Sequence, residues 1–377
     1  MKPKKIGILT ITPNVGFGGI MQAYALQSAL HDITGYNACI LDYGAHHSTR
    51  EKASYFIHSL YKIIVKHQFA KLTIQSERNF IGKNVKPFIK KNLNLTRKVD
   101  SPADLQRLIN DSFDIVVVGS DQVWRPKYVL GIENYFFKGV KDNIVKIAYA
   151  ASLGVDDWEF SSTETDVCKK LIKKFKYVSV REDSAVSLLR NNLDAEDVDC
   201  VMDPTMLLNR NSYKQFIISS CSTNSIFTYV LDTNPELENI VLKIARVLSL
   251  PIYRFNTSAE DSLRPLKERV APSVESWISG IYHSSLVITD SFHGCVFSII
   301  FNKPFYVVIN KARGSARFQS LLKWLNLENR IVSSIDEVDK IIDNNSIDWD
   351  FVNATINERR QAVIAKLHKV LMFDKHV

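Results

Sequence analysis

The sequence predicts an α/β fold built from two consecutive doubly wound domains, and three observations support this. The chain has 377 residues, which is long for one hydrophobic core. Short apolar runs alternate with stretches of helical periodicity, as in parallel sheets covered on both faces. The alternation breaks in an Asn- and Ser-rich stretch, 203–224, and then restarts. We therefore expect domains over 1–205 and 206–350, and a terminal helix over 351–377 that could cross back to the first domain.

The first domain opens with a βαβ pattern. An apolar run over 5–11 precedes apolar residues at helical spacing, from Ala23 to Ile33, and a second apolar run covers 38–42. A basic insert follows at about 50–98. Beyond it, Ser101-Pro102 predicts a helix start, with a cap residue and then proline at the first helical position. Four further strand-like runs complete this domain: 115–118, 144–150, 177–180 and 198–202.

The second domain repeats the alternation. A helical pattern covers 237–248, and Ile356, Val363, Leu367 and Val370 space like one face of a terminal helix. Two such domains in a row predict a cleft between them, with ligands at the carboxyl ends of the strands. The expected strands are 226–231, 251–255, 286–289 and 305–309.

The positive charge is concentrated in the insert. Segment 50–98 holds twelve Lys and Arg against two acids, whereas the whole chain has a net charge of +8. Such an insert favours an anionic partner, either a membrane surface or a phosphate. Its helical stretch 55–70, with Phe56, Leu60 and Ile63 along one side, could lie on an anionic membrane, or it could be a surface helix packed on the body. Nucleic acid is not expected, because no binding motif is present.

Cysteine usage and hydropathy indicate the compartment. The five cysteines are scattered and form no C-x-x-C pair, which argues against a disulfide framework and against a zinc site. No apolar run reaches the ~18 residues needed to cross a bilayer, and the first residues show no cleavage site for a signal peptide. We expect a cytoplasmic protein, at the inner face of the membrane if the insert touches lipid, with no metal and no cofactor.

Two polar turns follow predicted strands of the first domain. The turn at 12–19 is rich in glycine, so its backbone N–H groups could approach an anion; the alternative is an ordinary turn. The turn at 118–124 could hold sugar hydroxyls or a phosphate, and it could also cap a helix. The candidate acceptor-binding residues are Asn14, Gly16, Gly18, Gly19, Ser120, Asp121 and Gln122.

Arg181 emerges from the apolar run 177–180 and therefore needs an anionic partner. Its planar guanidinium suits a carboxylate or a phosphate of a ligand. The alternative is an internal ion pair with Glu182 or Asp183. Neighbouring residues of an extended chain point to opposite faces, so Arg181 and Glu182 are not expected to pair.

The segment 287–294 carries the strongest chemical signal. A buried run ends in Thr289, Asp290 and Ser291, and His293 then begins an apolar helix. An imidazole there could transfer a proton near neutral pH, with Asp290 or Ser291 orienting it. The alternative is a capping Asp beside a structural histidine. A Ser–His–Asp hydrolase triad is not expected, because Asp290, Ser291 and His293 are too close in sequence and no G-x-S-x-G elbow is present.

Taken together, these segments resemble the polysaccharide pyruvyl transferase family, from about Ile6 to Phe318. The resemblance implies two Rossmann-like domains in a GT-B-like arrangement with an interdomain cleft. It also implies phosphoenolpyruvate as donor, phosphate as leaving group and a sugar acceptor, often lipid-linked, on a capsular or other cell-surface glycan. The segments that carry it are 14–27, 119–124, 179–182 and 289–294.

The resemblance also suggests residue roles. His293 would be the acid/base, and Arg181 would bind the donor's carboxylate or phosphate. Many members have an arginine two residues before the motif histidine, where this chain has Ser291. Arg313 and Arg317 are the candidate replacements, and Asp290 and Ser291 would help bind the donor. Two alternatives stay open: a GT-B glycosyltransferase that uses a nucleotide sugar, and a non-catalytic sugar-binding protein of glycan assembly.

Overall fold

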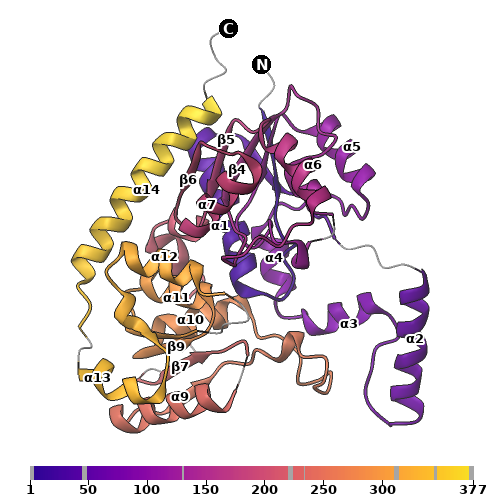
Figure 1. Ribbon diagram of the computed structural model, residues 1–377. Helices are drawn as coiled ribbons and strands as arrows, with labels where there is room; N and C mark the ends of the chain where they lie inside the picture. Colours follow the sequence, from indigo (N-terminus) through magenta and orange to yellow (C-terminus); the bar gives the residue numbers. More distant parts are fainter. Residues whose placement is uncertain are drawn as a thin grey trace.

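Two lobes, each with its own sheet and covering helices, make up the computed structural model of the chain (Figure 1). The sheets have six and five strands, and every strand pair is parallel. Apolar residues buried on both faces explain why the strands read as continuous apolar runs. The structure describes residues 4–44, 49–129, 131–219, 224–232, 234–309, 314–343 and 346–372.

The first lobe has the strand order β2-β1-β3-β4-β5-β6. Its strands are β1 (Lys5–Leu9), β2 (Asn37–Ile40), β3 (Ile115–Val118), β4 (Val145–Ala151), β5 (Tyr177–Val180) and β6 (Val198–Cys200). Its helices include α1 (Phe17–Thr34), α5 (Pro102–Ser112), α6 (Ser162–Ile172) and α7 (Asp183–Leu193). The predicted cap of α5 is confirmed, because the Ser101 hydroxyl accepts a 3.2 Å hydrogen bond from the Asp104 N–H.

The second lobe has the strand order β11-β10-β9-β7-β8. Its strands are β7 (Ile226–Tyr229), β8 (Ile252–Arg254), β9 (Leu286–Thr289), β10 (Phe305–Val308) and β11 (Ile331–Val332). Its helices include α9 (Pro235–Leu248), α10 (Val274–His283), α11 (Phe292–Ile300), α12 (Ala316–Trp324) and α13 (Val338–Asp343), and the short α8 (Arg210–Lys214) precedes β7.

An aromatic contact joins the lobes. Phe17, the first residue of α1, stacks on Trp277 of α10 with ring centroids 5.8 Å apart. Its ring also meets Tyr229 and Phe255 edge-on, at 6.1 Å and 5.4 Å. The amino end of α1 is therefore held against the second lobe.

The last helix, α14 (Trp349–Met372), runs from the second lobe along the first (Figure 1). Arg360 Nε donates to the Met206 carbonyl at 2.7 Å, and Lys366 Nζ lies 2.8 Å from Asp199 Oδ2. Its buried residues Val352, Ile356, Leu367 and Leu371 recur at helical spacing. This helix therefore packs back on the first lobe.

The basic insert contains α2 (Thr49–Ile64), α3 (Ile74–Ile81) and α4 (Lys86–Asn92), with α2 projecting from the body (Figure 1). The expectation that the first insert helix extends to residue 70 was wrong, because it ends at Ile64 and His67 has a left-handed φ of 49°. The insert also touches the second lobe, since Arg269 Nη1 lies 2.9 Å from Glu77 Oε1. Within the described residues, no helix is long and apolar enough to cross a membrane.

Candidate active site

A buried carboxylate, Asp203, joins the two lobes at the carboxyl ends of the strands. Asp203 follows strand β6, and Arg181 follows strand β5. Arg181 Nη1 donates a hydrogen bond to Asp203 Oδ2 at 2.7 Å. His293 Nε2, from the first turn of α11 in the second lobe, lies 3.4 Å from the same oxygen. Ser120, after β3, donates to that oxygen at 3.2 Å. The structure therefore brings an imidazole and a guanidinium from distant parts of the chain to one carboxylate.

The environment keeps Asp203 ionised. Its second oxygen accepts from the Thr205 N–H at 3.0 Å and from the Thr205 hydroxyl at 2.7 Å. Burial alone would raise the pKa of Asp203, but His293 and Arg181 lower that pKa well below its usual range.

Arg181 and a second arginine, Arg317, lie against one aromatic ring, Phe292. The guanidiniums of Arg181 and Arg317 lie 4.5 Å and 5.6 Å from the centre of the Phe292 ring. Burial, and after it the charge of Arg181, lowers the pKa of Arg317 to about 10. Within the described part of the chain, Arg181 Nε and Nη2 make no hydrogen bond, although Nη2 lies 3.7 Å from Asp121 Oδ1. These two donors are available for an anionic ligand.

The neighbour of Arg181 has a different role. Glu182 Oε1 accepts from the Ser152 hydroxyl at 2.9 Å and from the N–H groups of Leu153 and Gly154 at 2.8 Å and 2.9 Å. Glu182 thus holds the loop after β4. The prediction that Arg181 and Glu182 do not pair is confirmed, and the ion-pair partner of Arg181 is instead Asp203.

Gly18 explains how closely α1 approaches the second lobe. A Cβ placed on Gly18 would lie 2.2 Å from His293 Nδ1, so the imidazole occupies the space that a side chain would need. Gly16, two residues earlier, has no atom near its Cβ position within 4 Å. The absence of a side chain at Gly18 therefore makes room for the His293 ring. The sequence analysis interpreted this turn as an anion-binding turn and did not predict the contact with His293.

The other predicted donor residues make structural contacts. Asp290 accepts from the N–H groups of Leu231 and Asp232 at 2.7 Å and 3.0 Å. Ser291 caps α11 by accepting from the Gly294 N–H at 3.4 Å. These contacts match the capping alternative, and a donor-binding role for Asp290 and Ser291 stays a prediction. Arg313 lies outside the described residues.

The predicted acceptor residues make several different contacts. Ser120 is bonded to Asp203, and Gln122 Oε1 accepts from Arg125 Nη1 at 3.1 Å. Gly19 faces Asp121, whose Oδ2 is 3.7 Å from the Cβ position of the glycine. Asn14 lines a separate large pocket in the first lobe. A role in acceptor binding stays a prediction for all of these residues.

Comparison with known proteins decides the family. A sequence model described as polysaccharide pyruvyl transferase matches residues 17–311. The chain belongs to the polysaccharide pyruvyl transferase family. This assignment supports transferase activity in polysaccharide biosynthesis and a sugar or polysaccharide as acceptor. No curated protein matches the chain in sequence.

Solved structures confirm the fold of this pyruvyl transferase family member. UDP-GlcNAc 2-epimerase from Methanocaldococcus jannaschii is similar with a TM-score of 0.51 and 14% identity, over 96% of this chain and 99% of that one. The trehalose-6-phosphate phosphatase N-terminal domain from Candida albicans is similar with a TM-score of 0.50 and 10% identity, over 98% and 97%. The expected GT-B-like arrangement of two parallel α/β lobes is confirmed.

Sequence reasoning missed Asp203, the residue at the centre of the site in this pyruvyl transferase family member. We used it only to mark the boundary between domains, although it directly follows an apolar run, as Ser120 and Arg181 do. A polar residue just after a strand was the signal that could have found it. The Phe292 ring was also missed, because an aromatic residue at a helix start reads as core.

The contact between Gly18 and His293 gives a sharp prediction. Gly18→Ala should displace the imidazole and lower turnover by about 10²-fold, the effect of a misplacement of about 1 Å. The helix itself should not suffer, because alanine is a better helix former than glycine. Asp32→Ala, at an exposed position of the same helix, is the matched control and should keep wild-type turnover in the same assay of pyruvyl transfer. Equal turnover in both variants would contradict a role for the position of His293.

Proposed function

We propose that this pyruvyl transferase family member transfers pyruvate from phosphoenolpyruvate to two hydroxyls of a glycan precursor, forming a ketal. The observation that carries the proposal is the convergence of His293 and Arg181, from different lobes, on Asp203. The reaction needs an acid for the enol carbon and cations for a carboxylate and a phosphate. This site holds an imidazole beside a fixed carboxylate, with two guanidiniums next to it.

Protonation of the enol carbon is the first step. The His293 imidazolium donates its proton to C3 of phosphoenolpyruvate, and C2 becomes an oxocarbenium-like electrophile. One sugar hydroxyl bonds to C2 and returns its proton to His293. The C2–O bond to phosphate then breaks, and the second hydroxyl bonds to C2 and gives its proton to the departing phosphate. A positioned acid/base contributes roughly 10²–10⁴-fold to such a reaction, and Asp203 stabilises the imidazolium.

The arginines would bind the donor. Phosphoenolpyruvate carries a carboxylate and a phosphate, and the forked guanidiniums of Arg181 and Arg317 can hold one each. Phe292 lies against both and fixes their separation. His293 is only 6% exposed, so the donor must displace neighbouring side chains to reach it. The reaction itself requires no metal and no redox cofactor.

Ligand-dependent stabilisation separates this proposal from its rivals. Phosphoenolpyruvate should raise the melting temperature, since a ligand that binds only the folded state stabilises it by mass action. Stabilisation by UDP- or GDP-sugars alone would favour a nucleotide-sugar glycosyltransferase. Acceptor binding without phosphate release from phosphoenolpyruvate would favour a non-catalytic protein.

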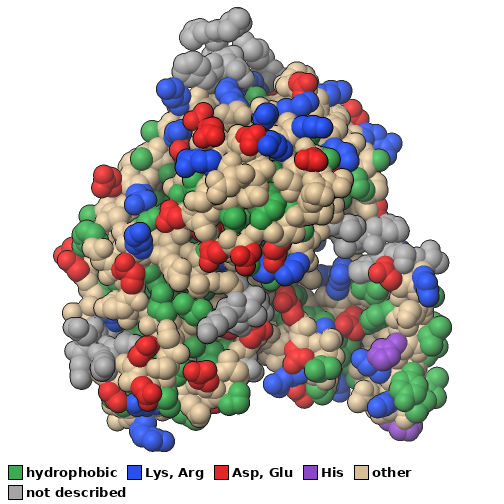
Figure 2. Space-filling model, viewed as in Figure 1, with side chains coloured by type: hydrophobic (Ala, Val, Ile, Leu, Met, Phe, Trp, Pro, Cys, Tyr) green, Lys and Arg blue, Asp and Glu red, His purple; other side chains and the backbone are tan. Residues whose placement is uncertain are grey.

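We also propose that α2 rests on an anionic membrane surface. It exposes Ile57 and Ile64 by 67% and 65%, and Phe56 and Tyr61 nearby are about half exposed. Figure 2 shows green hydrophobic side chains beside Lys and Arg on this projecting arm. Apolar side chains that enter the interface, flanked by cations that meet lipid phosphates, suit an anionic bilayer. Such contact would place the protein at the inner face of the membrane, near a lipid-linked acceptor.

Removing the apolar tip should weaken this contact. The double variant Ile57→Ser and Ile64→Ser should sediment several-fold less with vesicles that contain about one third anionic lipid, because about 2 kcal/mol of apolar burial is lost per side chain. The matched control changes two exposed apolar residues of α9, Leu242→Ser and Val247→Ser, and should sediment like the wild type. Equal loss in both variants, or no loss in either, would contradict a membrane role for α2.

A further inference from the structure

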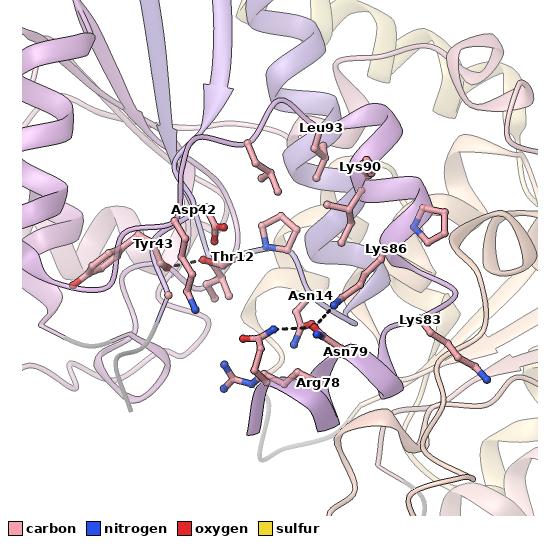
Figure 3. A pocket seen from close by; sticks show the side chains of 18 of the residues that line it. Thr12, Asn14, Asp42, Tyr43, Arg78, Asn79, Lys83, Lys86, Lys90 and Leu93 are labelled. Atoms are coloured by element: carbon pink, nitrogen blue, oxygen red, sulfur yellow. Dashed lines mark hydrogen bonds between the residues drawn. The ribbon is translucent and has the colours of Figure 1, made fainter. Parts of the chain in front are cut away.

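A pocket of about 990 Å³ opens at the carboxyl end of the first sheet, and no role described so far uses it. The loops after β1 and β2 form one wall, and α3 and α4 of the insert form the other (Figure 3). A cavity of this size can enclose a ligand as large as a sugar diphosphate.

The lining is strongly basic. Asp42 is the one carboxylate among the lining residues. Burial raises the pKa of Asp42, with Lys98 opposing that shift, and burial lowers the pKa of Lys86. Among the residues that the structure describes, none of the five lining cations has a carboxylate within ion-pair distance. These cations are Arg78, Lys83, Lys86, Lys90 and Lys98.

Two of these cations face the space in front of the β1 loop. Figure 3 shows the Lys86 side chain ending beside Asn79 and Asn14. The Arg78 side chain extends separately into the opening of the pocket, below Thr12 in this view, and Lys83 points away. Lys86 is held by a hydrogen bond to the Asn79 side chain, which also accepts from Gln75 at 2.8 Å. Both cations line one pocket, and neither has a carboxylate of the described residues within ion-pair distance, which predicts a bound phosphate group.

The rest of the lining suits the remainder of such a ligand. Tyr43 and Tyr135 line the pocket although both side chains are mostly buried. Tyr128 also lines it, and its ring is about half exposed, so it could stack on a sugar ring. The pocket is linked to the Asp203 cluster through the chain segment after β1. Asn14 of this lining lies four residues before Gly18, which seats His293.

We propose that this pocket binds the diphosphate that links the acceptor sugar to its carrier, with Arg78 and Lys86 as its principal ligands. The sugar would extend past Asn14 toward His293, and this placement rests on the proposed function. A lipid carrier and a nucleotide carrier share the diphosphate. The projecting α2, connected to α3 by a short segment, would leave a lipid tail next to the membrane.

Titration calorimetry of the full chain with inorganic pyrophosphate tests the site itself. The double variant Arg78→Gln and Lys86→Gln should bind pyrophosphate at least about tenfold more weakly, because two charge-assisted hydrogen bonds to the phosphates are lost. Lys170→Gln with Lys173→Gln, two exposed lysines at the end of α6, is the matched control and should bind like the wild type. No binding by the wild type, or equal binding by all three proteins, would overturn the proposal.

Competition then identifies the carrier. A sugar with a short isoprenyl diphosphate and a nucleotide diphosphate sugar are each titrated against bound pyrophosphate. Displacement by either supports the site and names its carrier, whereas displacement by the free sugar alone would overturn it. In turnover assays the double variant should raise the KM for the acceptor and leave the KM for phosphoenolpyruvate unchanged. A wild type that binds pyrophosphate here but releases no phosphate from phosphoenolpyruvate would leave the pocket intact and overturn only the proposed function.

Discussion

His293→Ala is expected to lower pyruvate transfer by roughly 10²–10⁴-fold while the protein stays folded. The imidazole is the acid in the proposed reaction, and its Nε2 lies 3.4 Å from Asp203 Oδ2. No other histidine approaches Asp203 among the described residues. The measurement is phosphate release from phosphoenolpyruvate in the presence of acceptor, with circular dichroism to verify the fold.

His283→Ala is the matched control. This imidazole is also partly buried and lies in the second lobe, at the end of α10, away from the Asp203 contacts. Its removal should leave turnover near that of the wild type. Near-wild-type turnover in His293→Ala, or the same loss in both variants, would show that His293 is not the acid.

Asp203→Ala is expected to have the largest effect on stability. The carboxylate is fully buried and lies 2.7 Å from Arg181, so its removal leaves the buried guanidinium with only the more distant Asp121, at 3.7 Å, as an ion-pair partner among the described residues. Breaking a buried pair from one side costs about 3–5 kcal/mol. Urea denaturation should show this loss. The control is Lys174→Ala, which removes one partner of the exposed ion pair with Asp142. It should lower the free energy of unfolding by less than about 1 kcal/mol.

The same carboxylate predicts how stability depends on pH. Its pKa is lower in the folded protein than its ordinary value of 3.8, so the unfolded chain binds the proton more readily. The contribution of Asp203 is therefore complete above that ordinary value and is lost as the pH falls from there toward the folded pKa. The unfolding free energy of Asp203→Asn should fall less steeply than that of the wild type in this range. Parallel curves would contradict the assignment.

The structure also changes what Arg181→Ala should do. If Arg181 only bound the donor, as the sequence analysis suggests, this variant would chiefly weaken the binding of phosphoenolpyruvate. Since Arg181 is the ion-pair partner of Asp203, the variant must also lose stability. Arg317→Gln separates the two effects, because Arg317 lies beside Phe292 and is not bonded to Asp203 in any described contact.

The strands were predictable because buried parallel strands are continuous apolar runs, and 115–118, 177–180 and 286–289 match β3, β5 and β9 residue for residue. Strand ends were also a sound guide to Ser120, Arg181 and His293, which the structure brings together. Partners were not predictable in the same way. The pairing of Arg181 with Asp203, and of Gly18 with His293, depends on how strands and lobes pack, which local periodicity does not encode.

Product analysis in deuterated water tests the account most directly. Incubation with phosphoenolpyruvate and a glycan acceptor should release one phosphate per pyruvate ketal formed. In deuterated water the exchangeable hydrogen of His293 is deuterium. Its transfer to C3 should leave one deuterium in the methyl group of the ketal. Transfer of a sugar from a nucleotide donor, with phosphoenolpyruvate left unconsumed, would contradict it.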